Sequence, residues 1–237
     1  MDSQTWDTRR LSFGPAADLY DRVRPRYPVE ALHWMLSMVG DRPVRVVDLG
    51  AGTGILSRQL AELGHQVIAV EPDAGMRARH GSAVEGSAEH IPLPDGAVDA
   101  VVAGQAYHWF DPDRTHLEVA RVLHPGGVFA ALWNDADART QWTVTFTEII
   151  DGPREPMPLS DFGPRFGAVG QAEFPHDVWT TADDLVALAS TRSPYLVGSP
   201  TEREQIVVAV RRLITEAGLT GRFAMPHVTR VHRAVRR

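Results

Sequence analysis

A short run that ends in three glycines, Val46 to Gly54, has the residue types expected of a loop that holds a nucleotide-like ligand. Glycine at alternate positions, from Gly50 onward, permits a tight turn and lets a ligand approach the backbone closely. Apolar residues at helical spacing follow this run. A helix N-terminus, with unpaired N–H groups and a positive dipole end, should therefore face the same ligand.

Two features of this run select the kind of ligand. Dinucleotide enzymes place a pyrophosphate at such a helix start and use the spacing Gly-x-Gly-x-x-Gly. Here the spacing is Gly-x-Gly-x-Gly, and Asp48 stands just before the first glycine. A carboxylate there would repel a diphosphate and attract an ammonium group. The run therefore favours a ligand with an amino-acid part, of which S-adenosylmethionine is one, over a nicotinamide dinucleotide.

A second acidic residue, Glu71, lies 23 residues after Asp48, at the end of the next strand candidate. A carboxylate at this offset can accept hydrogen bonds from both hydroxyls of a ribose, as the acidic residue about 20 residues on does in dinucleotide folds. Glu71 therefore supports a nucleoside at the glycine run and weakens the alternative that the run is only a turn.

Strand patterns alternate with helical patterns through the first half of the chain. The predicted strands are 45–49, 66–70, 98–103 and 128–133, and the predicted helices are 29–39, 55–63, 74–79 and 116–123. Such alternation predicts right-handed βαβ crossovers and a mainly parallel sheet covered by helices on both faces.

The alternation weakens after Asn134. Further helices are predicted over 142–150, from Thr181 onward and over 202–217, and a last edge strand over 222–233. Thr180 or Thr181 is the expected N-cap of the helix that starts near Thr181. The segment 152–175 is rich in proline, glycine and phenylalanine. It is predicted to be a loop or an irregular cap.

The composition narrows the class of function. The chain has 237 residues, 43% of them hydrophobic, which is enough for one sizeable core with a small appended subdomain. The net charge of −6 disfavours a nucleic-acid partner, and the arginines near the C-terminus are interpreted as a solvated tail. Without cysteine there are no disulfides, thiolate metal sites or cysteine nucleophiles, and no other metal site is predicted. No basic leader and no apolar run of roughly 18 residues is found, which predicts a cytoplasmic protein without a membrane partner.

Four segments together resemble the class I S-adenosylmethionine-dependent methyltransferases, in particular a small-molecule branch that includes trans-aconitate and ubiquinone-biosynthesis-like methyltransferases. The segments are 46–54 (VVDLGAGTG), 67–76 (VIAVEPDAGM), 86–99 (GSAEHIPLPDGAVD) and 121–129 (RVLHPGGVF). The resemblance implies a Rossmann-like, doubly wound α/β fold with a mainly parallel, seven-stranded sheet and a C-terminal cap insertion. It is good over residues ~13–135 and only general beyond them.

The resemblance also implies a division of the chain into four parts. They are an N-terminal lid segment (1–40), a Rossmann-like core that binds S-adenosylmethionine (41–138), a substrate cap (139–200), and a last helix and edge strand that complete the core (201–237).

Most cofactor contacts are likewise implied by the resemblance. The residues expected to contact S-adenosylmethionine are Tyr20, Arg24, Tyr27, Asp48, Gly50, Ala51, Gly52, Glu71, Pro72, Met76, Ser87, Ala88, Glu89 and Gln105. In this assignment Asp48 lies near the ammonium group, Glu71 holds the ribose, and Pro72 and Met76 flank the adenine. Many relatives have aspartate where Ser87 stands, so the contact with the adenine amine would lack a charge here.

Methyl transfer from a sulfonium is a direct displacement that needs alignment and exclusion of water, and a base only if the nucleophile must lose a proton. His108 follows the strand 98–103 and is the best base candidate, with a structural or pocket-lining role as the alternative. The other residues expected near the substrate are Tyr107, Trp133, Asn134, Arg192 and Tyr195, each with packing as the alternative. Four histidines without ligand spacing are interpreted as surface residues: His80, His90, His124 and His176.

These observations lead to one expected function and two alternatives. The expected function is S-adenosylmethionine-dependent transfer of a methyl group to an oxygen or nitrogen, in preference to a carbon, of a small metabolite, with S-adenosylhomocysteine as product. A binding protein that holds S-adenosylmethionine without turnover is the first alternative, and a dehydrogenase is the second. The identity of the methyl acceptor and the oligomeric state stay open.

Overall fold

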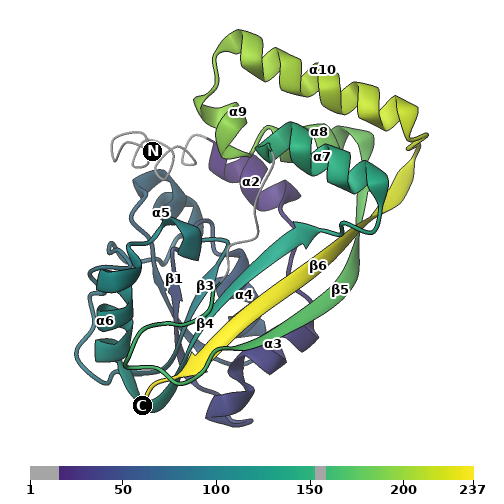
Figure 1. Ribbon diagram of the computed structural model, residues 1–237. Helices are drawn as coiled ribbons and strands as arrows, with labels where there is room; N and C mark the ends of the chain where they lie inside the picture. Colours follow the sequence, from purple (N-terminus) through teal and green to yellow (C-terminus); the bar gives the residue numbers. More distant parts are fainter. Residues whose placement is uncertain (1–15, 153–158) are drawn as a thin grey trace. The chain divides into compact units, whose positions relative to one another are not determined.

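The computed structural model describes residues 16–152 and 159–237, and these residues form two compact units (Figure 1). We call them the sheet unit (described residues within 26–134, 158–174 and 229–237) and the helical unit (described residues within 16–25, 135–157 and 175–228). Part of the expected lid segment, 1–15, and part of the expected cap, 153–158, lie outside the described residues.

A single sheet of six strands is found in the described part of the chain, in the order β2-β1-β3-β4-β6-β5. The strands are β1 (Arg45–Leu49), β2 (Gln66–Val70), β3 (Val98–Gly104), β4 (Leu123–Ala136), β5 (Gly170–Thr181) and β6 (Arg222–Val235). Strands β2, β1, β3 and β4 pair in parallel, as the alternating pattern predicts. Gly127, near the start of β4, bonds to Arg236, just after the end of β6, so β6 runs antiparallel to β4.

Two details of the predicted sheet are wrong. Six strands and not the expected seven are paired in the described residues, and a single parallel bridge joins Val70, at the end of β2, to Val84. The C-terminal strand β6 was expected at an edge but lies between β4 and β5. The edge position belongs to β5, which the sequence analysis assigned in part to a loop.

Helices of the sheet unit cover both faces of the sheet. They are α3 (Val29–Leu36), α4 (Ile55–Glu62), α5 (Ala74–His80) and α6 (Pro112–Val122), with short 3₁₀ turns η2 (Ser37–Val39) and η3 (Tyr107–Trp109). Alternate residues of β1, β3 and β4 enter two different buried clusters, since successive strand residues point to opposite faces. One cluster includes α6 and the other α3 and α4, so each face of the sheet has its own core.

The helical unit has a separate core. Its helices are α2 (Ala17–Val23), α7 (Gln141–Asp151), α8 (Ala182–Ala189), α9 (Ser193–Val197) and α10 (Pro200–Glu216). Thr181 caps α8 by accepting from Asp184, as predicted, and Ser199 forms a capping box with Glu202 at the start of α10. Helix α10 packs with α7 and α8 around Phe146, so it completes this core instead of the sheet unit.

The C-terminal arginines do not form a solvated tail. Arg233 lies over the ring of Trp34 at 3.6 Å, and Arg230 pairs with Glu173. Strand pairing fixes the backbone up to Arg236, which forms a bridge with Phe166. This part of the sequence is thus ordered by the sheet, which the charge pattern alone could not indicate.

Candidate cofactor site and active site

The glycine run forms the turn between β1 and α4. Gly50, Gly52 and Gly54 all have positive φ angles, of 69°, 57° and 90°, which only glycine adopts without strain. Gly50 also approaches Ala106 so closely that an added Cβ would lie 2.7 Å from that side chain. At Gly52 an added Cβ would meet no heavy atom within 4 Å. The loop therefore presents open space above Gly52, at the carboxyl end of the parallel strands, where α/β sheets bind ligands.

Glu71 follows β2 and is tied to the same turn. One carboxylate oxygen accepts from the backbone N–H of Gly52 at 2.8 Å, and the other accepts from that of Asp73 at 2.8 Å. Burial raises the pKa of Glu71, and these two backbone bonds act against that rise. Each oxygen can accept a further hydrogen bond, so the carboxylate is fixed in position and can still receive two hydroxyl groups.

Asp48 is buried beneath the turn, with 1% of its surface exposed. Burial and the nearby Glu71 raise its pKa to about 7, although the hydrogen bond from the Ser57 hydroxyl at 2.6 Å acts to lower it. The Ser57 oxygen in turn lies 3.1 Å from Nε2 of His80. A carboxylate at this pKa gains much from a cation, which is what an ammonium group of a ligand would supply.

His80 was interpreted as a surface residue, and this is wrong. Its ring lies against the turn, 2.7–2.8 Å from the place of a Cβ on Gly54, and it bonds Ser57. It stands in the last turn of α5, and nothing in the sequence indicates that this turn meets Gly54. His176 is also partly buried, beside His227 at 5.7 Å between ring centres, whereas His90 and His124 are exposed as predicted.

The residues expected around the adenine come from two loops. Asp73 caps α5 by accepting from the N–H of Met76 at 2.8 Å, which fixes Met76 in a buried position next to Pro72. Ser87 pairs with His90 through backbone bonds, and Ala88 is buried between them. The Glu89 carboxylate accepts from the N–H of Asp111 at 3.1 Å, so it serves the start of α6.

Gln105 directly follows β3 and has a backbone conformation that is strained for a residue other than glycine. It has a φ of 57° and is the one non-glycine residue with positive φ among those the structure describes. Its backbone N–H donates to Leu132, and its side-chain amide donates to the carbonyl of Asn134. Strain of about 1–3 kcal/mol at such a position is common at functional sites. Tyr27 approaches the same strand end, with its hydroxyl 2.8 Å from the place of a Cβ on Gly104.

The structure brings the side chains of His108 and Trp133 together, whereas the side chain of Tyr107 packs in the core. The indole N–H of Trp133 donates to Nδ1 of His108 at 3.3 Å. Tyr107 is buried in the core of the sheet unit, and its hydroxyl bonds His116 at 2.9 Å. Burial raises the pKa of Tyr107 to about 12. Tyr107 thus has the packing role that stood as the alternative.

Asn134 is also occupied by the protein. It is buried, its amide donates to the carbonyl of Arg26 at 3.1 Å, and its side-chain oxygen accepts from Thr229. Asn134 therefore joins β4 to β6 and to the chain before Tyr27.

The remaining candidates belong to the helical unit. The guanidinium carbon of Arg24 lies 4.4 Å from the centre of the Tyr20 ring. Its Nε donates to the hydroxyl of Thr191 at 3.1 Å, and its Nη2 donates to the carbonyl of the same residue. Arg192 faces the buried carboxylate of Asp151 at 3.7 Å. Tyr195 is half-buried on α9, next to Arg203. These side chains form a polar group within one unit, and their roles toward a ligand stay predictions.

The described residues contain neither a cluster of metal ligands nor a helix that could span a membrane. No group of three or more histidine, aspartate or glutamate side chains in this part of the chain could hold a metal ion. None of the helices described is both long and apolar enough to cross a membrane.

Comparisons with known proteins agree with this geometry. A family described as the methyltransferase domain matches residues 47–131. An uncharacterized methyltransferase of Mycobacterium tuberculosis is 40% identical over 230 residues, which cover 92% of this chain and 93% of the relative. An uncharacterized methyltransferase-like protein of Schizosaccharomyces pombe is 29% identical over 213 residues, 80% of each chain. The solved YcgJ protein of Bacillus subtilis matches in fold, with a TM-score of 0.56 at 18% identity over 89% of this chain and 99% of that one.

The glycine turn, the fixed acid after β2 and these relatives define one class of protein. The chain belongs to the class I S-adenosylmethionine-dependent methyltransferases.

Proposed function

We propose that this protein binds S-adenosylmethionine at the turn between β1 and α4 and transfers its methyl group to an oxygen or nitrogen of a small metabolite. The main observation behind the proposal is the position of the Glu71 carboxylate beside Gly52. The turn offers open space at Gly52, and the carboxylate of Glu71 is held beside it by two backbone bonds.

Different residues of the site would bind the cofactor and position the acceptor. The bound cofactor supplies a methyl group already activated by a sulfonium. Asp48 would hold the ammonium group, Glu71 the ribose hydroxyls, and Met76 one face of the adenine. Gln105, His108 and Trp133 stand at the ends of β3 and β4, where the acceptor must approach the methyl group in line. The helical unit, with Arg192 and Tyr195, is proposed as the cap that selects the acceptor.

Calorimetric titration tests the cofactor. We expect S-adenosylmethionine and S-adenosylhomocysteine to bind with one site per chain and NAD to give no heat. Absence of binding by the first two would refute the proposal. A screen of small carboxylic acids, phenols and amines for methylated products then separates an enzyme from a protein that only holds the cofactor.

Cofactor affinity should depend on pH through Asp48. Its pKa is raised to about 7 in the protein without ligand, so below pH 7 the carboxyl is mostly protonated and cannot attract the ammonium group. Affinity should therefore rise between pH 5.5 and 7, by up to about tenfold per pH unit for one linked proton. Titrations across this range measure the effect.

Two variants control the pH experiment. Asp48→Asn should bind weakly and with little change over the same range. Ser57→Ala removes the hydrogen bond that lowers the pKa of Asp48, so the rise should move to higher pH. A pH profile that is identical in all three proteins would show that another group controls binding.

His108 should act through its shape and polarity and not as a base. Because Nδ1 accepts from Trp133, the neutral ring carries its proton on Nε2 and has no free lone pair for a substrate proton. His108→Ala should then lower kcat by less than about tenfold, since loss of a general base costs roughly 10²–10⁴. The test is to measure kcat of each variant with saturating cofactor. A loss of a hundredfold or more that His108→Gln does not restore would show that His108 is the general base.

A further inference from the structure

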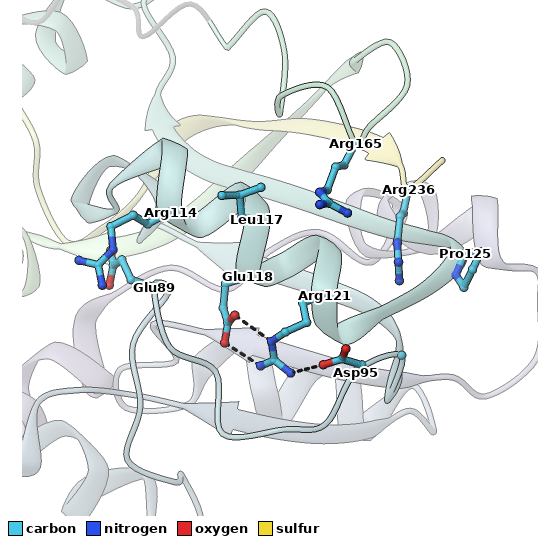
Figure 2. A pocket seen from close by; sticks show the side chains of 10 residues that line it. Glu89, Asp95, Arg114, Leu117, Glu118, Arg121, Pro125, Arg165 and Arg236 are labelled. Atoms are coloured by element: carbon cyan, nitrogen blue, oxygen red, sulfur yellow. Dashed lines mark hydrogen bonds and ion pairs between the residues drawn. The ribbon is translucent and has the colours of Figure 1, made fainter.

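A groove runs along the outer face of α6, within the sheet unit and apart from the glycine turn (Figure 2). Its volume is about 800 Å³. One wall is α6, from Arg114 to Arg121, and the other wall carries Arg165 and Arg236. The groove therefore gathers four arginines on a protein whose formal net charge is −6.

The acidic residues of the groove are already engaged. Arg121 bonds Glu118 at 2.7 Å and Asp95 at 2.9 Å, as the dashed lines of Figure 2 mark. Glu118 also accepts from the N–H of Ile91, and Glu89 accepts from that of Asp111. Each of these three carboxylates thus already has a hydrogen-bond partner within the protein.

The other arginines lack such partners. In the described part of the chain, Arg114, Arg165 and Arg236 form no ion pair, and the side chain of Arg236 donates to the carbonyl of Leu123. The backbone at Arg165 is fixed, because its carbonyl accepts from the N–H of Arg237 and the neighbouring Phe166 bridges Arg236. The side chains that remain available in the groove are therefore positive, one on α6 and two on segments joined by backbone bonds.

An apolar side chain lies among these charges. Leu117 is 56% exposed and stands three residues after Arg114 and four before Arg121, on one face of α6. A large exposed side chain among charged groups is a common anchor in protein interfaces. Its position between the arginines suits an occupant with acidic groups and an apolar group on one side.

We propose that this groove docks an acidic amphipathic helix of a partner protein. Carboxylates of the helix would pair with Arg114, Arg165 and Arg236, and an apolar residue would pack on Leu117. A small anion fits less well, because Arg114 and Arg236 lie at opposite ends of the groove and do not converge on one point (Figure 2). A nucleic-acid backbone fits less well too, because phosphates offer no apolar group to pack on the exposed Leu117 and the protein carries a net charge of −6. This proposal does not depend on the reaction at the glycine turn.

The test uses the full chain and a fluorescein-labelled helical peptide with glutamates on one face and leucines beside them. Fluorescence anisotropy should detect binding that weakens as salt increases. The double variant Arg114→Glu, Arg165→Glu should bind at least about tenfold more weakly, and Leu117→Ser should also weaken binding. The matched control is Arg211→Glu, which reverses an exposed charge on α10 and should leave the affinity unchanged.

Other results would overturn the proposal. They are no binding by the peptide, equal loss in the Arg211→Glu variant, or equal affinity after glutamines replace the glutamates of the peptide. Tighter binding of oligodeoxythymidine than of the peptide, abolished by the same double variant, would assign the groove to nucleic acid instead. Thermal unfolding of each variant, at a midpoint close to that of the native protein, ensures that lost binding reflects the groove.

Discussion

Gly52→Val should abolish cofactor binding while the protein remains folded. An added Cβ would meet no protein atom within 4 Å, so the valine would enter the open space that the cofactor is proposed to fill. The φ of 57° adds strain of about 1–2 kcal/mol for a residue with a side chain, which is smaller than the stability of a typical domain. Calorimetric titration with S-adenosylhomocysteine and a thermal melt measure the two effects separately.

Gly64 provides a matched control for this substitution. It follows the other end of α4, has a φ of 88°, and also offers open space to a Cβ. Gly64→Val should therefore cost similar stability and leave the dissociation constant unchanged. If Gly52→Val bound the cofactor as the native protein does, the ligand would have to lie elsewhere.

Glu71→Ala should raise the dissociation constant for S-adenosylmethionine by at least about tenfold. The ribose hydroxyls would lose two hydrogen bonds to a charged acceptor, worth roughly 1.5–3 kcal/mol each at most. The substitution also frees the N–H groups of Gly52 and Asp73, so part of the loss would come from a less ordered turn.

A second variant separates these two causes. Asp73→Ala removes the cap of α5, at a cost of about 0.5–2 kcal/mol in stability, but leaves the acceptor for the ribose in place. It should weaken binding much less than Glu71→Ala does. Equal losses in both variants would mean that Glu71 acts by ordering the turn, and an unchanged affinity in Glu71→Ala would refute the ribose contact.

The parallel half of the sheet could be predicted because its signals are local. Strands β1 and β2 begin and end as expected, since each is a short β-branched run bounded by glycine or proline. The same local chemistry predicted the turn between β1 and α4 and the acid after β2. The structure also confirms the cap at Thr181, because capping depends on residues only three apart.

The parts that were missed depend on contacts between distant residues. Strand β5 contains Gly170 and Pro175, which suggest a loop, yet proline is tolerated at a sheet edge. The position of His80 against Gly54, and the burial of Tyr107 against His116, arise only when separate elements pack together. Propensity and spacing carry no information on such pairs, so the sequence placed His80 at the surface and left Tyr107 between a substrate contact and a packing role.

The chain enters and leaves the sheet unit repeatedly, and this limits how the protein can be divided. It changes unit at residues 25/26, 134/135, 174/175 and 228/229, and once more between 152 and 159. No continuous fragment contains one whole unit without part of the other, so neither unit can be produced alone by truncation. A fragment that stops at residue 134 keeps the glycine turn and Glu71 but lacks β6, the neighbour of β4 in the sheet.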